Sequence, residues 1–364
     1  SMKLLTLLFF AVGLSATLFF AAPVVYAAGC DVSPELVGPC SEQAETGEPA
    51  VAAAIATSIV TPEPPHDTLF GRRCYGRLAD NAIVYAAPAR AATPLRHVGD
   101  GYLFATVLRR LQNDATETWY EINPGEFVHE NDIQLAQVSD FQGVATTSQP
   151  RTPFGWVVQE VRPSSLQDKE PDPAFDKLPR FTVVEIHDAI QGKDDWIWYD
   201  IGNDRWVKQT YLSIVEVDSR PEAVGKDEFW VEVDLYEQTF AAYEGDRLVY
   251  ATLISSGLNR WPTNEGLFQV WDRFREYKMS GAEGKVDYYY LEDVPYIMYF
   301  DDLNGIALHG TYWHDRFGYK HSHGCVNMPI KDAEWTFNWS AAAPNDLWVW
   351  VHTSDPATHL RQSE

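Results

Sequence analysis

The stretch FWVEVDLYEQTFAAYEGDRLVYATLISSG, residues 229–257, alternates apolar and polar side chains with a period of two. That period is typical of β-strands with one buried face, because successive side chains of a strand point to opposite sides of the sheet. The turn YEGDR lies between two such runs. The stretch therefore predicts a β-meander, in which consecutive strands pair with one another.

The sequence after this stretch is also rich in strand signals. IALHG (306–310) and LWVWVH (347–352) are apolar runs of the length expected for buried strands. Only residues 330–343 show helical spacing of apolar residues, with Pro329 near the start of the segment. Residues 227–353 are therefore predicted to form one mainly β domain with a single short helix.

An internal repeat predicts two more β-rich units on the N-terminal side. WYEINPGEFVHENDI (Trp119–Ile133) and WYDIGNDRWVKQTYL (Trp198–Leu212) share Trp-Tyr-acidic-Ile, a polar turn and then aromatic-Val. Each copy fits two alternating strands joined by a turn that carries Asn, Gly or Asp. The repeat therefore predicts a hairpin in each of two β-rich units. Its resemblance to bacterial SH3-like domains implies that these units are two small β-barrels, at residues 67–138 and 150–217.

Length and charge limit the class of protein. The chain has 364 residues, 45% of them hydrophobic, which is enough for two or three packed domains. Its 28 Lys and Arg against 52 Asp and Glu give a net charge of −24. Nucleic acid is excluded as a partner because phosphate binding needs clustered positive charge. The acidic excess is interpreted as a solvated surface.

The N-terminal sequence predicts export. Lys3 precedes an uncharged apolar run, Leu4–Val25, and then the small residues YAAG, so residues 1–28 fit a signal peptide or a retained membrane anchor. Lipidation at Cys30 is a third alternative. Residues 29–66, rich in Ala, Pro, Glu and Thr, are predicted to be a flexible linker, and residues 354–364 a tail. We therefore expect the protein at the extracytoplasmic face of the cell envelope.

The four cysteines divide into two groups. Cys30, Cys40 and Cys74 lie in or near the N-terminal segment, whereas Cys325 stands alone. In an exported chain, either Cys30–Cys40 or Cys40–Cys74 could form a disulfide, and the sequence does not decide between them. Cys325 is the candidate free thiol.

Four of the ten histidines lie with Cys325 in HGTYWHDRFGYKHSHGCVN, residues 309–327. This stretch fits a zinc site, a set of packed histidines around an inert thiol, or a thiol nucleophile with its base. Against zinc, no second cysteine lies nearby and no His-Glu-x-x-His motif occurs. The possible zinc ligands are His309, His314, His321, His323 and Cys325.

The same stretch has the parts that acyl transfer by a thiol requires. Gly324 directly precedes Cys325, so the backbone can turn tightly and bring amide donors to an oxyanion. His309 ends an apolar strand, which would hold its ring at a fixed position. A histidine base distant in sequence from its nucleophile is normal, because geometry defines such pairs.

These residues resemble the signature of the YkuD-type L,D-transpeptidases. The signature is a histidine, a spacer of about a dozen residues, and then Ser/Thr-His-Gly-Cys-hydrophobic-Asn/Arg. PTNEGLF (Pro262–Phe268) is similar to the family's P-T-P-x-G-x-F segment, with Asn264 in place of the second proline. VPYIMYFDDLNGIALHG (294–310) is similar to the strand that leads into the histidine. The resemblance covers residues 228–352.

The resemblance implies a β-sandwich catalytic domain and a role for each matched residue. Cys325 would be the nucleophile and His309 the general base, oriented by the backbone carbonyl of Gly310. His323 would support the loop and polarise the site, and the backbone amides near His323, Gly324 and Cys325 would form the oxyanion pocket. The remaining candidates are Ser322 and Asn327, which would shape the loop, and Trp313, Met298 and Tyr299, which would line the substrate groove or pack in the core.

The implied reaction is 3→3 cross-linking of peptidoglycan stem peptides through a cysteine thioester, without a metal or organic cofactor and open to acylation by carbapenems. L,D-carboxypeptidase activity and anchoring of proteins to peptidoglycan are alternatives that use the same site. The two N-terminal units resemble bacterial SH3-like domains, which bind cell-wall peptides or glycans, or serve as spacers. A non-catalytic wall-binding adaptor is therefore another alternative. Membrane contact is expected only through an N-terminal anchor.

Overall fold

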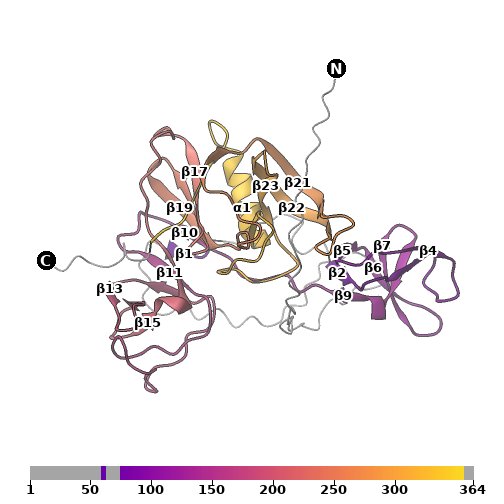
Figure 1. Cartoon of the computed structure of the whole chain (residues 1–364), viewed down its shortest axis with the longest axis horizontal. Coiled ribbons are helices and arrows are strands. Elements are labelled where there is room, and N and C mark those ends of the chain that lie inside the picture. The colour runs from indigo at the N-terminus through magenta and orange to yellow at the C-terminus, as the bar shows by residue number, and fades with distance from the viewer. Residues whose placement is uncertain (1–58, 63–73, 356–364) are drawn as a thin grey trace.

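The computed structural model describes residues 59–62 and 74–355, and in these residues strands dominate and there is one α-helix (Figure 1). The predicted mainly β fold is therefore confirmed. The described part of the chain has no helix with the length and hydropathy needed to cross a membrane. The predicted export segment, most of the predicted linker and residues 356–364 of the predicted tail lie outside the described residues.

The stretch that predicted a β-meander forms three consecutive antiparallel strands, β17 (Phe229–Asp234), β18 (Thr239–Glu244) and β19 (Arg247–Leu253). Gly245 makes the turn between the last two with a φ of +57°, a left-handed conformation that favours glycine. The C-terminal strand β25 (Trp348–His352) lies parallel to β17, and β20 (Gly266–Gln269) pairs with β25.

We call residues 227–353, the predicted catalytic domain, the catalytic block. Two strands from outside this block extend the sheet. β10 (Val144–Thr146) pairs with β19, and β1 (Ile59–Val60) pairs with β10. The prediction that residues 29–66 are only a linker is therefore wrong at Ile59–Val60. Two residues carry too little periodic pattern to be recognised as a strand, and their partner is distant in the sequence.

The second sheet carries the residues singled out by their sequence. Its strands in this block are β21 (Asp272–Gly281), β22 (Tyr289–Asp301), β23 (Ile306–Gly310) and β24 (Val326–Met328). Helix α1 (Ile330–Ser340) packs against β22 and β23. The helix ends three residues before the predicted end, in a turn that precedes Pro344, because the residue before a proline disfavours helical geometry.

The main core lies between the two sheets. Its fully buried members include Val231 and Phe240 from the first sheet, Ile297 and Leu308 from the second, and Ala333 from α1. A sandwich with one covering helix is the arrangement that buries the apolar face of each sheet.

The first N-terminal unit contains two sheets that share a core with Val84, Val107 and Ile122. One of them is continuous with the second catalytic sheet, because β5 (Tyr102–Val107) pairs in parallel with residues 289–291 of β22. The other strands are β2 (Cys74–Leu78), β3 (Ile83–Tyr85), β4 (Pro94–His97), β6 (Arg109–Gln112), β7 (Thr118–Asn123), β8 (Glu126–His129) and β9 (Ile133–Leu135).

The second N-terminal unit consists of two three-stranded sheets around a separate core that includes Val157, Tyr199 and Ile214. Its strands are β11 (Phe154–Val157), β12 (Val183–Glu185), β13 (Asp188–Gln191), β14 (Ile197–Asp200), β15 (Trp206–Lys208) and β16 (Leu212–Val215). Figure 1 shows the first unit in purple to the right of β21 and β22, and the second in rose below β10 and β19.

The internal repeat has the structure that its sequence predicted. In the first copy β7 and β8 form an antiparallel hairpin that is followed by the 3₁₀ turn Glu130–Asp132. In the second copy β14 and β15 form the hairpin, followed by the 3₁₀ turn Gln209–Tyr211. The resemblance of both units to SH3-like domains stays a prediction.

Cys74 is disulfide-bonded, and Cys325 is a free cysteine. The choice between the expected pairings of Cys30, Cys40 and Cys74 lies outside the described residues.

Asp332, fully buried on α1, joins the helix to β19 and to the segment before β10. Its Oδ1 accepts hydrogen bonds from the Gly143 N–H at 2.9 Å and from the Tyr250 hydroxyl at 2.6 Å. Its Oδ2 accepts a hydrogen bond from the Thr252 hydroxyl. Burial raises the pKa of Asp332 to about 6, against the opposing effect of these donors.

We predict that Asp332→Ala lowers the free energy of unfolding by about 2–4 kcal/mol, because it leaves three buried donors without an acceptor. Urea unfolding followed by circular dichroism measures the change. Asn338→Ala, an exposed change on the same helix, is the control and should cost less than about 1 kcal/mol. An equal loss in both variants would contradict the role given to Asp332.

Candidate active site

The register of two parallel strands brings the predicted base and nucleophile together. In β23 and β24, Leu308 pairs with Val326 and His309 pairs with Asn327. Cys325 directly precedes β24. Because side chains alternate along a strand and paired residues point to the same side, His309, Asn327 and Cys325 share one face of the sheet.

His309 is held in one orientation by its own strand. Its Nδ1 lies 3.0 Å from the backbone oxygen of Gly310, so Nδ1–H donates and Nε2 is left as the proton acceptor. Burial lowers the pKa of His309 to about 4, and the Gly310 carbonyl partly opposes this. The imidazole is therefore neutral at pH 7, as a general base must be. A Cβ at Gly310 would lie 2.9 Å from Cγ of Pro295, so the tight packing here requires glycine.

Cys325 is a protonated thiol at neutral pH. Burial raises the pKa of the Cys325 thiol to about 11, although a hydrogen bond with the backbone of Ala307 opposes this. Reactive cysteines with a lowered pKa usually lie beside a cation or a helix N-terminus. The imidazole of His309 is also neutral, so at pH 7 both groups are uncharged, unlike a thiolate–imidazolium pair.

The loop before Cys325 is closed by its own hydrogen bonds. Ser322 donates its hydroxyl proton to the Cys325 carbonyl and accepts a hydrogen bond from the Gly324 N–H at 3.1 Å. Gly324 has a φ of +123°, which favours glycine. Ser322 thus shapes the loop as expected. The Gly324 amide, one of those expected near the oxyanion pocket, donates to Ser322 in this conformation, and the prediction of the pocket itself stays a prediction.

Thr263 fixes the same loop from outside, and the sequence reasoning assigned it no role. Its hydroxyl donates to the Gly324 carbonyl at 2.7 Å and accepts from the Gly257 N–H at 2.9 Å. Thr263 is the second residue of the PTNEGLF segment, so the signal was present in the family resemblance. What the sequence could not give was the long-range partner, 61 residues away.

The side chain of Asn327 contacts His314, outside the loop that Asn327 was expected to shape. Nε2 of His314 lies 2.8 Å from the side-chain amide of Asn327, and Nδ1 of His314 accepts from the Arg316 N–H at 3.1 Å. Burial, followed by electrostatic interaction with the titratable rings of His321 and His309, lowers the pKa of His314 well below its usual value. The buried histidine is therefore neutral and serves as a link between the 314–316 turn and the strand of the nucleophile.

His323 is exposed at the mouth of the site, between two aromatic rings. Its ring lies 3.9 Å from that of Trp261 and 5.4 Å from that of Tyr289, measured between centroids. Burial and then Arg260 lower its pKa. Burial, followed by the effect of Cys325, raises the pKa of the Tyr289 phenol to about 12. Sequence reasoning missed Trp261 and Tyr289.

The three candidate groove residues differ in their position. Trp313 is partly buried with its ring 5.6 Å from that of His309, and Tyr299 is partly exposed near Cys325, which contributes to the raised pKa of the Tyr299 phenol. Met298 has no exposed surface, and its sulfur faces Ser340 and Arg273 on the side of α1. The prediction that Met298 lines a groove is therefore wrong, because Met298 points to the opposite face of β22 from Tyr299.

Potential metal ligands converge elsewhere. Among the residues that the structure describes, the one group whose ligand atoms lie within 4.8 Å of one another is Asp218, Glu232 and His352. Nε2 of His352 lies 2.8 Å from Oε1 of Glu232, and burial raises the pKa of Glu232 to about 8. The histidines of residues 309–325 form no such group in the described chain.

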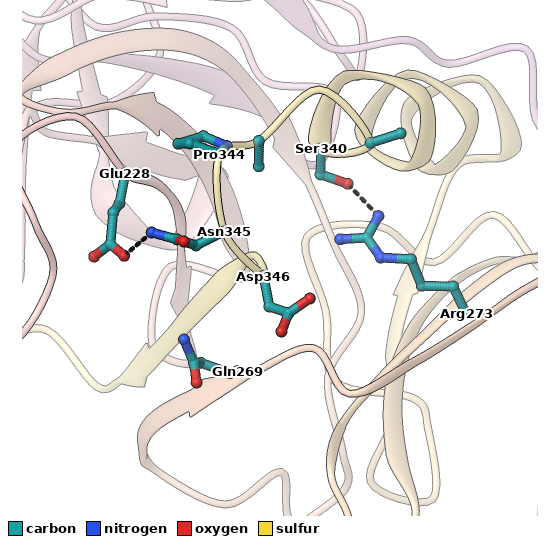
Figure 2. Close-up of a pocket in the computed structure, with 9 residues that line it drawn as sticks. Glu228, Gln269, Arg273, Ser340, Pro344, Asn345 and Asp346 are labelled. Atoms are coloured by element: carbon teal, nitrogen blue, oxygen red, sulfur yellow. Dashed lines mark hydrogen bonds between the residues drawn. The ribbon is translucent and has the colours of Figure 1, made fainter.

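A polar hollow of about 700 Å³ lies at the C-terminal end of α1. Figure 2 shows Arg273 reaching Ser340 on one side of it and Asn345 donating to Glu228 on the other. Neither Cys325 nor His309 lines this hollow. It lies on the α1 side of β22, away from the thiol and its base.

The catalytic block matches a known family. Residues 228–352 match the family model YkuD, the L,D-transpeptidase catalytic domain. The Bacillus subtilis (strain 168) protein YciB, whose L,D-transpeptidase name is provisional, is 30% identical over 121 residues. That alignment covers 30% of this chain and 59% of YciB, so the chain spans less than two thirds of this curated relative.

Two solved structures are each similar to about a third of the chain. The Enterococcus faecium L,D-transpeptidase, as a cysteine-to-serine mutant, is 27% identical over 34% of this chain and 50% of that chain, with a TM-score of 0.31. The L,D-transpeptidase from Stackebrandtia nassauensis is 26% identical over 36% of this chain and 58% of that chain, with a TM-score of 0.28. The similarity is thus confined to part of each chain.

We predict that alkylation of Cys325 by iodoacetamide is slow at pH 7 and rises about tenfold per pH unit towards a plateau near pH 11, because only the thiolate reacts. Intact-mass spectrometry of the folded protein at a series of pH values measures the rate. A plateau already at pH 6–7 would show instead that the thiol is ionised beside a protonated imidazole.

Proposed function

We propose that the chain is an L,D-transpeptidase that cross-links peptidoglycan stem peptides, with Cys325 as nucleophile and His309 as general base. The observation that carries this proposal is the register of β23 and β24, which pairs His309 with Asn327, two residues after Cys325. The family match of residues 228–352 supports the choice of substrate.

In the acylation step the thiol and the imidazole act together. Nε2 of His309 accepts the Cys325 proton while Sγ attacks the carbonyl of the third stem residue, a diamino acid linked through its L centre to D-Ala. The negative charge moves to the carbonyl oxygen, where backbone amides of the loop would stabilise it. His309 then returns the proton to the departing D-Ala amine, and a thioester remains.

In the second step an amine on another stem takes the acyl group. Neutral Nε2 of His309 removes a proton from the attacking amine, the carbon–sulfur bond breaks, and the thiol is restored with that proton. The product is a 3→3 cross-link. Attack by water would make the enzyme an L,D-carboxypeptidase, and attack by a protein lysine would anchor that protein to the wall. The three outcomes differ only in the acceptor.

The presence of a thiol together with a histidine base argues against a role as an adaptor without catalysis. A wall-binding protein without catalysis has no use for a base whose tautomer is fixed by the Gly310 carbonyl and whose burial keeps it neutral. The hydrogen bonds from Ser322 and Thr263 to the loop around Cys325 likewise hold that loop in one shape.

We place the reaction outside the cytoplasmic membrane. Cys74 is disulfide-bonded, and disulfides persist mainly in oxidising compartments. The apolar segment within residues 1–28 supports export, although it lies outside the described residues.

We predict that Cys325→Ala abolishes new cross-links when the protein is incubated with muropeptides, and that His309→Gln slows their formation about 10²–10⁴-fold, the usual worth of a general base. Mass spectrometry of the muropeptides separates cross-linking from trimming and from anchoring. His97→Gln, an exposed change in the first N-terminal unit, is the matched control. Cross-linking that survives Cys325→Ala would rule out the enzyme.

We predict that the second-order rate of Cys325 acylation by the carbapenem imipenem holds down to about pH 5 and falls as the pH drops through about 4. The sign follows from the base, because His309 acts only when neutral and burial keeps its pKa near 4. Intact-mass spectrometry of the acyl adduct gives the rate at each pH. A midpoint near 6.5, the ordinary value for histidine, would contradict the burial of the base.

A further inference from the structure

The segment between base and nucleophile contacts the base and the strand that follows the nucleophile. We call residues 311–321 the catalytic connector. Inside the protein, the ring of Trp313 lies 5.6 Å from that of His309. The next residue, His314, contacts the side chain of Asn327, two positions after Cys325. A shift of the connector would therefore move the base and the strand of the nucleophile relative to one another.

The first N-terminal unit holds one end of the connector. The ring of Tyr75 stacks on that of Tyr312 with centroids 3.6 Å apart and planes within 3° of parallel. The hydroxyl of Tyr102 donates to the Trp313 carbonyl at 3.2 Å. Tyr312 in turn donates its hydroxyl proton to the Glu292 carbonyl in β22 at 2.6 Å.

The same unit also holds the hairpin of β21 and β22 beside the site. Besides the pairing of β5 with β22, the Thr106 N–H donates to Glu292 at 3.0 Å and the Thr106 hydroxyl donates to Asp293 at 2.7 Å. Tyr289, whose ring lies next to His323, is the first residue of β22. The first unit thus fixes the hairpin and the connector together.

The second N-terminal unit holds the other end of the connector. One terminal nitrogen of Arg180 donates to the Asp315 carboxylate at 3.0 Å. The other donates to the backbone oxygens of Asp315 at 2.6 Å and Phe317 at 3.0 Å. A Cβ at Gly318 would lie 2.6 Å from Cγ1 of Val158, so this contact has no space for a side chain.

We propose that the two N-terminal units position the catalytic pair, by holding the catalytic connector from opposite sides. Arg180 and Tyr102 are the positioning residues with separable polar contacts. The fork of Arg180 is the stronger restraint, because a guanidinium that donates to several oxygens has a fixed geometry that an isolated surface ion pair lacks. The units are then parts of the active-site assembly, whatever else they bind.

Two readouts move in opposite directions if the connector is loosened. Trp313 would withdraw from His309 and water would enter, so the thiol would ionise more easily and alkylation by iodoacetamide would rise. Acylation by imipenem needs the aligned pair, and a displacement of about 1 Å can cost 10²-fold in rate. We expect Arg180→Gln to raise alkylation at pH 8 at least threefold and to slow acylation at least tenfold.

Tyr102→Phe should change both rates in the same directions by a smaller factor, since it removes one hydroxyl and leaves the ring. The double variant should change both rates more than either single variant does. Arg180→Lys keeps the charge but not the forked geometry, so it should recover less than half of the acylation rate that Arg180→Gln loses. Asp315→Asn keeps both backbone contacts of Arg180, so its alkylation and acylation rates should stay within twofold of wild type. Thermal unfolding of each full-length variant shows that it is folded.

Matched controls come from arginines that do not contact the connector. Arg162 donates to the Phe175 carbonyl within the second unit, and Arg90 donates to Glu117 within the first. Arg162→Gln and Arg90→Gln should leave alkylation and acylation within twofold of wild type. If Arg180→Gln and Tyr102→Phe also stay within twofold in both assays, the positioning role is wrong.

The acylation readout rests on the proposed function, whereas alkylation of the thiol does not. If the wild-type protein is alkylated but never acylated by imipenem, that result contradicts the proposed function and leaves the positioning role untouched. In that case a rise in alkylation confined to the connector variants would still establish the positioning role, and its absence would overturn it.

Discussion

The parallel pairing of β23 with β24 is the constraint on which the rest of the site depends. A slip of one residue in that register would turn either His309 or Cys325 to the other face of the sheet, where α1 packs. The surrounding features stabilise this register. Ser322 and Thr263 close the loop before the nucleophile, Gly310 allows the strand to approach Pro295, and Asp332 joins α1 to the first sheet.

The electrostatics of the site follow from its burial. The imidazole and the thiol are both neutral at pH 7 because neither charged form is compensated where it lies. A neutral pair has little long-range attraction, so its reactivity depends on distance and direction more than on charge. This dependence on geometry is consistent with the many contacts that hold the connector. Arg180, Tyr75 and Tyr102, which make these contacts, come from segments far from the signature in sequence.

Local sequence patterns predicted what depends on local structure. The period of two gave the meander of residues 229–257, the repeat gave two matching hairpins, and the signature gave Cys325 and His309. The missed features all join distant segments: Ile59–Val60 adds to a sheet through β10, and Thr263 reaches Gly324. Met298 was misplaced for another reason. Periodicity shows that a strand has two faces but not which face is solvent-facing once both carry large side chains.

The shared sheets make the catalytic block a poor candidate for excision as a recombinant fragment. A truncation to residues 227–353 would strip β10 from β19 and β5 from the start of β22. Each cut would expose a row of backbone N–H and C=O groups that neighbouring molecules can pair with. Such a fragment would tend to self-associate through these exposed strand edges, even with its signature residues intact.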